Sequence, residues 1–164
     1  MLDIGRLGLV CNSRDKDLEP VEALKKALKN PTDQRLFKIA AALKIGLSSQ
    51  EVYELSGVDP WFLHKFENII AVERNLRALS LENRRVNKVI RKAKRLGFSD
   101  SQIAICLKTD EDIVREFRRR YGVIPVIKQI DTLAAEWPTR TNYIYLTYGG
   151  KEDDLSLESD GRKV

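Results

Sequence analysis

The chain is poor in the residues that build metal sites and catalytic centres: its 164 residues include two cysteines and one histidine. A structural zinc site needs four cysteine or histidine ligands, and this inventory cannot supply them. Cys11 and Cys106 lie far apart in the sequence. They could form a disulfide, but we interpret them as buried thiols of a reducing compartment, which makes the cytoplasm the expected location.

Motifs for phosphate binding and nucleophilic catalysis are also missing, since the sequence has no Gly-rich phosphate loop and no Gly-x-Ser-x-Gly. A lone histidine on a helix, here His64, is more often a packing or surface residue than a base. Long apolar runs are absent, because no stretch reaches the ~18 residues of a membrane helix, and the N-terminus does not read as a signal peptide. We therefore expect no catalytic residue, cofactor site, metal site or membrane partner in this chain; a small enzyme with an unrecognised site is a further hypothesis.

The charge surplus is mild: 29 Lys and Arg stand against 24 Asp and Glu, a formal net charge of +5. Such a balance permits acidic partners without requiring them. The length and the 43% hydrophobic content suit one globular domain, or two small ones, with a real core.

Apolar residues at helical spacing dominate the chain as far as Gly122. They predict helices over about residues 20–29, 33–45, 48–55, 60–76, 82–96, 99–107 and 110–121. The expected N-terminal caps are Thr32 or Asp33, Ser48 in a capping box with Glu51, Asp59 followed by Pro60, Ser99, and Thr109.

Two segments, beginning at Gly46 and Gly97, share one pattern of glycine, serine cap, short helix, turn and second helix. The repeat predicts two helix–turn–helix units in one bundle. A DNA-reading helix would need cations or amides at its start. Here one second helix opens with Asp59 and aromatic residues and the other with three carboxylates at 110–112, so nucleic acid is an improbable partner.

The densest basic stretch is an expected helix that carries Arg84, Arg85, Lys88, Arg91, Lys92, Lys94 and Arg95. We interpret it as the solvated face of an amphipathic helix, with contact to an acidic partner or a phosphate backbone as the alternative. It lacks the aromatic residues that single-strand binding requires.

The pattern changes after Gly122. Residues 123–130 are rich in β-branched side chains, and residues 141–148 alternate in a way that predicts a strand. One helical turn is expected at residues 134–136, and the acidic tail from Lys151 is expected to be loose. The predicted fold class is mostly α: a helical bundle with two weakly repeated helix–turn–helix units, ending in an extended segment and one or two short strands.

The most specific pattern of the chain runs from Lys128 to Tyr148, in the form K-x-[IV]-D-T-x-A-A-E-[FYW] followed by T-x-Y-x-Y-x-T-Y. This run resembles the segment that closes the central helical domain of the carbamoyl phosphate synthetase large subunit. AAALKIGLSSQEVYEL, VDPWFL and KRLGFSDSQIA agree with the resemblance. The forms around Trp137 and Thr141 are most similar to the eukaryotic, pyrimidine-pathway type. The resemblance covers about residues 18–157, and the first 17 residues do not match clearly.

The resemblance implies a non-catalytic oligomerisation domain between two ATP-grasp halves. In that family the intact enzyme makes carbamoyl phosphate from bicarbonate, glutamine-derived ammonia and two ATP. ATP, Mg and K are then expected only in the flanking domains. The implied partners are those ATP-grasp domains, a second copy of the chain and the glutaminase component. The pyrimidine and arginine pathways both remain open, and a stand-alone helix–turn–helix-like nucleic-acid-binding module is the alternative.

Four parts are expected along the chain. Residues 1–17 are a leader or the end of a preceding domain, and 18–122 are the helical oligomerisation block. Residues 123–150 are an extended docking segment, and 151–164 an acidic tail toward a following ATP-grasp domain.

The docking segment is expected to tie the block to its flanking domains. Its motif residues are Lys128, Asp131, Thr132, Ala134, Ala135, Glu136, Thr141, Tyr143, Tyr145 and Tyr148. We interpret Trp61 and Phe62 as core residues of the block. If the pair is exposed, we expect it to mark an interface.

Overall fold

A computed structural model describes residues 5–12, 19–130, 133–134, 136–137 and 143–155 of the chain. The described part is mostly helical, which confirms the predicted fold class. No helix within it is both long enough and apolar enough to span a membrane. Its elements are α1 (Val21–Lys29), α2 (Arg35–Lys44), α3 (Ser49–Ser56), α4 (Pro60–Arg77), α5 (Val86–Arg95), α6 (Asp100–Leu107), α7 (Glu111–Arg120), β1 (Val126–Ile130) and β2 (Tyr143–Thr147).

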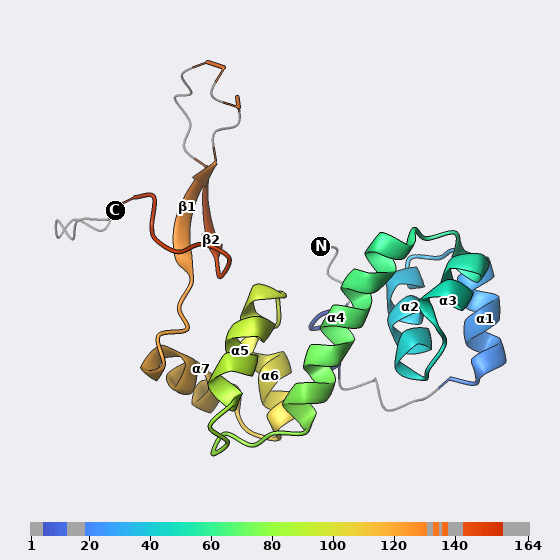
Figure 1. Ribbon diagram of the computed structural model, residues 1–164, viewed down its shortest axis with the longest axis horizontal. Helices are drawn as coiled ribbons and strands as arrows, with labels where there is room; N and C mark the ends of the chain where they lie inside the picture. The colour runs from blue at the N-terminus through green and yellow to red at the C-terminus, as the bar shows by residue number, and fades with distance from the viewer. Residues whose placement is uncertain (1–4, 13–18, 131–132, 135, 138–142, 156–164) are drawn as a thin grey trace.

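Helix α4 is the axis of the helical block: α2 and α3 pack on one part of it, and α5 and α6 on another (Figure 1). One continuous hydrophobic core runs through both sides. Helix α4 contributes apolar side chains to this core along its length, among them Leu63, Val72 and Leu76, each without exposed area. The two halves of the block are therefore one packed unit.

The two predicted repeat units are present. Ser48 caps α3 and Ser99 caps α6, each in a reciprocal capping box with the third helical residue, Glu51 and Gln102 respectively. Asp59 caps α4 ahead of Pro60, as the sequence predicts. These caps are local interactions, which is why the sequence reveals them.

Three predicted helix starts are wrong. The helix expected from residue 82 begins at Val86, because residues 80–85 form turns in which the Asn83 side chain accepts from the Arg85 N–H at 2.9 Å. Gln34 takes the cap position expected for Thr32 or Asp33, and Asp110 the one expected for Thr109. Neither makes a side-chain cap hydrogen bond.

Strands β1 and β2 form an antiparallel hairpin that projects from the helices (Figure 1). The register pairs Val126 with Thr147 and Ile130 with Tyr143. The helical turn expected at residues 134–136 is wrong for the described positions. Ala134 is left-handed, with φ of 52°, and the Glu136 N–H closes a turn on the Leu133 carbonyl at 2.9 Å.

The tail expected to be loose is bound to β1 over its described start. The Asp153 carboxylate accepts from the Ile127 N–H at 2.6 Å, and the Asp154 N–H donates to the Ile127 carbonyl at 2.9 Å. The Asp154 carboxylate also accepts from Gln129 N and from Lys128 Nζ. Asp153 and Asp154 thus bond the backbone groups at the outer edge of β1, which a third strand would otherwise pair.

Candidate functional site

The hairpin exposes apolar side chains on both of its faces. Leu146 is 71% exposed, and Ile144, which shares its face, is 52% exposed. Tyr143 and Tyr145 alternate with them on the other face, at 52% and 48%. A two-stranded hairpin is marginally stable alone, and contiguous exposed apolar surface marks a protein-binding site. The hairpin is thus a candidate docking element.

The described docking motif residues lie on or near this hairpin. Lys128 is on β1 and ion-pairs with Asp154 at 2.6 Å, while Tyr143 and Tyr145 are on β2. Hydrogen bonds from the Lys128 ammonium and the Gln129 N–H hold the pKa of Asp154 below its ordinary value. Ala134 and Glu136 belong to the turn at the hairpin tip. The motif residues outside the described part are Asp131, Thr132, Ala135 and Thr141.

The base of the hairpin is held by basic side chains of the helical block. Tyr148, directly after β2, lies with its ring 4.9 Å from Lys94 Nζ and 5.9 Å from the Arg118 guanidinium. Arg95 Nε donates to the Tyr148 carbonyl at 3.3 Å. Cations over an aromatic face are attracted by the ring quadrupole. Tyr148 therefore anchors the end of β2, a different role from that of the exposed Tyr143 and Tyr145.

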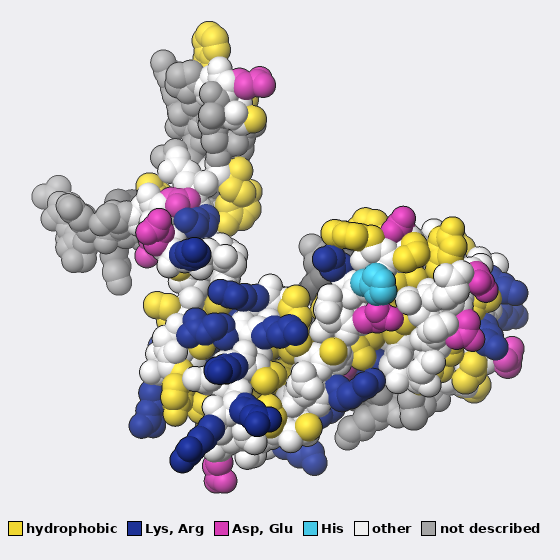
Figure 2. All heavy atoms as spheres, in the orientation of Figure 1, with side chains coloured by type: hydrophobic (Ala, Val, Ile, Leu, Met, Phe, Trp, Pro, Cys, Tyr) yellow, Lys and Arg dark blue, Asp and Glu magenta, His cyan; other side chains and the backbone are white. Residues whose placement is uncertain are grey.

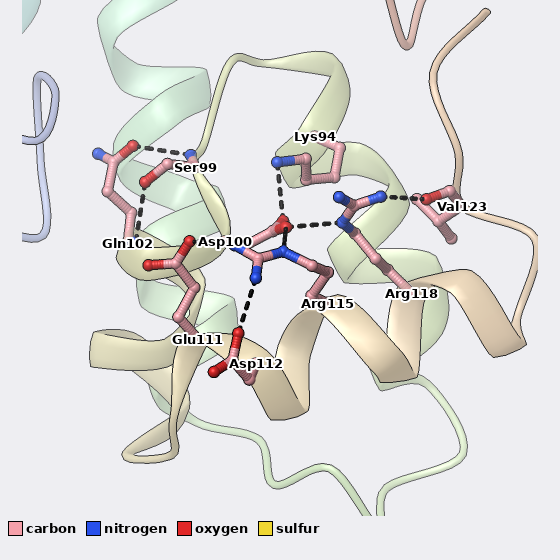
Figure 3. A network of polar contacts seen from close by, with 9 residues as sticks. All are labelled: Lys94, Ser99, Asp100, Gln102, Glu111, Asp112, Arg115, Arg118 and Val123. Atoms are coloured by element: carbon pink, nitrogen blue, oxygen red, sulfur yellow. Dashed lines mark hydrogen bonds and ion pairs between the residues drawn. The ribbon is translucent and has the colours of Figure 1, made fainter.

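The two cations beside Tyr148 share a buried carboxylate, that of Asp100 (Figure 3). Asp100, 7% exposed, accepts from Lys94 Nζ at 2.9 Å and from Arg118 Nε at 2.7 Å. Arg118 Nη1 also donates to the Val123 carbonyl at 3.3 Å, where the chain leaves α7 for β1. Asp100 on α6 thus joins α5 to α7. Through Lys94 and Arg118 it also reaches Val123, before β1, and Tyr148, after β2.

The charge state of Asp100 follows from this geometry. Burial opposes its ionisation, but hydrogen bonds from Lys94 and Arg118, together with their charges, outweigh burial and lower its pKa. The ionised carboxylate is the form that the site requires. Sequence reasoning missed Asp100, Lys94 and Arg118 as site residues, because only the tertiary packing of three helices reveals their burial.

Trp61 and Phe62 are not core residues: they are 59% and 54% exposed. Their rings make an edge-to-face contact at 5.0 Å, and Lys65 Nζ lies 4.5 Å from the Trp61 ring. Hydrophobic side chains gather at this α3–α4 end, next to the histidine in Figure 2. We call Trp61, Phe62 and Lys65 the aromatic patch.

Most of the basic stretch forms a broad cationic surface over α5 (Figure 2). Lys94 is the exception, because it is buried beside Asp100, so its interpretation as part of a solvated face is wrong. Arg91 Nη2 donates to the Tyr121 carbonyl at 3.3 Å, and Arg95 Nε donates to the Tyr148 carbonyl. Part of this surface is therefore used in hydrogen bonds within the chain. The acidic residues 110–112 stand at the start of α7, and two of them pair with Arg115 at 2.7 Å. These contacts are intramolecular and do not favour nucleic acid.

The two cysteines are buried, as expected, but they are bonded to each other rather than free thiols. The cysteine-based argument for a reducing compartment is therefore removed. Glu73 of α4, 3% exposed, has a carboxylate oxygen within 4.8 Å of both sulfurs. Cysteine and carboxylate are ligand types that zinc accepts, but this carboxylate already pairs with Lys44 at 3.1 Å and Arg77 at 2.9 Å.

The described residues thus form a helical block that carries an exposed hairpin and an exposed aromatic patch. Residues 1–122 match the family described as carbamoyl-phosphate synthetase large chain, oligomerisation domain. The chain therefore belongs to this family, which is an assembly part of a ligase rather than its catalytic part. The match includes residues 1–17, in which the sequence alone reveals no clear resemblance.

Relatives of the chain are much longer proteins. The chain is 46% identical over 147 residues to the multifunctional protein CAD of Squalus acanthias, a match that covers 90% of the chain and 6% of that protein. It is 38% identical over 167 residues to the carbamoyl phosphate synthase large chain of Archaeoglobus fulgidus, covering 99% and 15%. An arginine-specific large chain from Neurospora crassa is 43% identical over 139 residues, covering 84% and 12%. The chain thus spans 6–15% of these relatives.

Proposed function

We propose that this chain is the connecting and assembly domain of a carbamoyl phosphate synthetase, and that its hairpin docks on a flanking ATP-grasp domain of the same polypeptide. The carrying observation is that the hairpin projects from the block with apolar side chains exposed on both faces. An intramolecular partner would bury these side chains and supply the packing that two strands lack. The complete protein would make carbamoyl phosphate from bicarbonate, glutamine-derived ammonia and two ATP in the cytoplasm. ATP, Mg and K would bind in the flanking domains, and the glutaminase component would be a further partner.

The test uses the full-length polypeptide that carries this sequence. Leu146→Asp places a charge at the most exposed position of β2, and Leu36→Asp, on α2, is the matched control because Leu36 is also exposed, at 56%. We expect Leu146→Asp to lower the rate of carbamoyl phosphate synthesis about tenfold or more and to expose the hairpin to proteolysis. Leu36→Asp should change neither. Equal behaviour of the two variants would exclude the docking role of the hairpin.

A second contact, with a second copy of the chain, is favoured by the aromatic patch. Exposed tryptophan and phenylalanine are typical anchors of protein interfaces. The patch lies at the α3–α4 end and the hairpin leaves the block beyond α7, so both contacts can form at once (Figure 1). The family's oligomerisation role supports an identical chain as the occupant.

Sedimentation equilibrium of the 164-residue chain tests this contact. The double variant Trp61→Ser and Phe62→Ser should weaken self-association at least about tenfold, while Leu36→Ser leaves it unchanged. Self-association of the same strength in the double variant would assign the oligomer to another surface. That result would leave the hairpin proposal standing, because the two surfaces are separate.

A further inference from the structure

The N-terminal residues 5–12, which we call the plug, are built into the helical core. Val10 and Cys11 are at most 1% exposed, and the Val10 carbonyl accepts from Gln102 Nε2 of α6 at 2.6 Å. A Cβ on Gly8 would lie 2.4 Å from Gln102 Nε2, so the plug and α6 are in close contact. The covalent bond between Cys11 and Cys106 joins the same two elements.

Weaker contacts hold the outer part of the plug. The Arg6 guanidinium lies 4.1 Å from the centre of the Phe37 ring, and its Nη2 is 3.4 Å from Gln34 Oε1. The Asn12 side chain accepts from the Leu7 N–H at 2.9 Å and donates to the Gly8 carbonyl at 3.0 Å, which closes the plug on itself. Arg6 is thus a side chain that fastens the plug to the start of α2.

We propose that the Cys11–Cys106 bond is a thiol-exchange site for low-molecular-weight thiols and disulfides, and that it controls whether the plug stays attached to the block. In reduction, the thiolate of a small thiol attacks one sulfur, forms a mixed disulfide and releases the other cysteine as a thiolate, which takes up a proton. A second small thiol then displaces the first. Two cysteine thiols and one small-molecule disulfide result, and the reverse reaction restores the bond with that disulfide as oxidant.

The plug itself shields the site. Cys11 and Cys106 are 0% and 2% exposed, so a dissolved thiol cannot reach either sulfur while the plug is seated. Exchange therefore requires residues 5–10 of the plug to lift while the bond is still intact, and its rate follows the population of this lifted state. The seated plug protects its own covalent anchor, which makes the bond slow to reduce and slow to form again.

The experiment counts thiols and measures their rate of appearance. The 164-residue chain, purified without reductant, is alkylated and weighed intact; no alkylation is expected before glutathione is added. Arg6→Ala loosens the plug without touching either cysteine, and we expect it to be reduced at least about threefold faster. Arg84→Ala, an exposed arginine before α5, is the matched control and should be reduced at the wild-type rate.

Loss of the bond has a second readout. The bond closes a loop of 95 residues, so reduction should lower the melting temperature by about 10 °C or more and make the plug sensitive to proteases. Several results would overturn the proposal: two alkylatable thiols in the protein purified without reductant, equal reduction rates in wild type and Arg6→Ala, or a reduced protein that melts at the oxidised temperature. One equivalent of zinc bound in place of the bond would also overturn it.

Discussion

At the scale of single residues, the chain surrounds two buried carboxylates with cations. Asp100 lies between Lys94 and Arg118, and Glu73 pairs with Lys44 and Arg77. A buried charge without a partner is costly. The Asp100 cluster joins the consecutive helices α5, α6 and α7, and the Glu73 cluster joins α2 to α4. These charges therefore fix the arrangement of the helices as well as local geometry.

Asp100→Asn should lower the free energy of unfolding at neutral pH by about 3 kcal/mol, because it leaves buried Lys94 and partly buried Arg118 without their anion. Urea unfolding measures the change. Asp112→Asn is the matched control: Asp112 pairs with Arg115 at an exposed position, and such pairs contribute at most about 1 kcal/mol. A loss as small as that of Asp112→Asn would contradict the role assigned to Asp100.

The same carboxylate gives the stability of the chain a pH dependence of known sign. The pKa of Asp100 is lower in the folded chain than in the unfolded one. Its stabilisation is therefore present above about pH 4, the ordinary pKa of aspartate, and is lost as the pH falls through the folded pKa. Between about pH 5 and pH 3, the free energy of unfolding should fall less in Asp100→Asn than in wild type. Parallel pH profiles would contradict this.

At the scale of elements, the two capping boxes have the same geometry but different surroundings. The box of Ser48 and Glu51 is exposed, and its hydrogen bonds lower the pKa of Glu51, the bond from the Ser48 N–H being the larger cause. The box of Ser99 uses Gln102, which is 3% exposed and also binds the plug. The Ser48 cap stabilises α3 alone, whereas the Ser99 cap also helps to position the plug through Gln102.

Ser99→Ala should therefore cost more than Ser48→Ala. We expect about 1 kcal/mol for Ser48→Ala and about 2 kcal/mol for Ser99→Ala, since caps contribute within this range. The second substitution also removes the hydroxyl that accepts from the backbone N–H of Gln102, a buried residue. Paired urea unfolding curves compare the two. Equal losses would mean that Gln102 keeps its contact with Val10 without the cap.

Signals that lie close together in the sequence predicted the elements well. Serine caps, the Asp59–Pro60 start and the alternation of residues 141–148 all act within a few residues. The interpretation of Trp61 and Phe62 as core is wrong, because helical spacing is the same whether a face is buried or exposed. Their role in an interface stays a prediction. The Asp100 cluster depends on the packing of α5, α6 and α7, and the cysteine pairing joins residues 95 positions apart. No local pattern encodes either contact.

At the scale of the whole molecule, one packed block carries an appendage with no core of its own. The cluster of buried residues spans α1 to α7, whereas the hairpin contributes none of its members. Stability should therefore differ sharply between the two parts. This division suits a domain whose block is rigid and whose hairpin acquires its packing from a neighbour.

Hydrogen exchange of the 164-residue chain measures this difference. Backbone amides of α4 should exchange at least about a hundredfold more slowly than those of β1 and β2, because opening the hairpin breaks few buried contacts. Within the hairpin, Ile127 N should be among the better protected amides, since it donates to Asp153. Similar protection of α4 and the hairpin would contradict the division.

The two edges of the hairpin are unequal. Asp153 and Asp154 cover the outer edge of β1 with charge, whereas no described residue pairs with the outer edge of β2. An uncovered edge that carries apolar side chains is a template on which another strand can add. Because the outer edge of β1 is covered and that of β2 is open, a further strand can add to the sheet only beside β2. At high concentration, the chain without its flanking domains should therefore aggregate edge to edge through β2, and Ile144→Lys should suppress this aggregation.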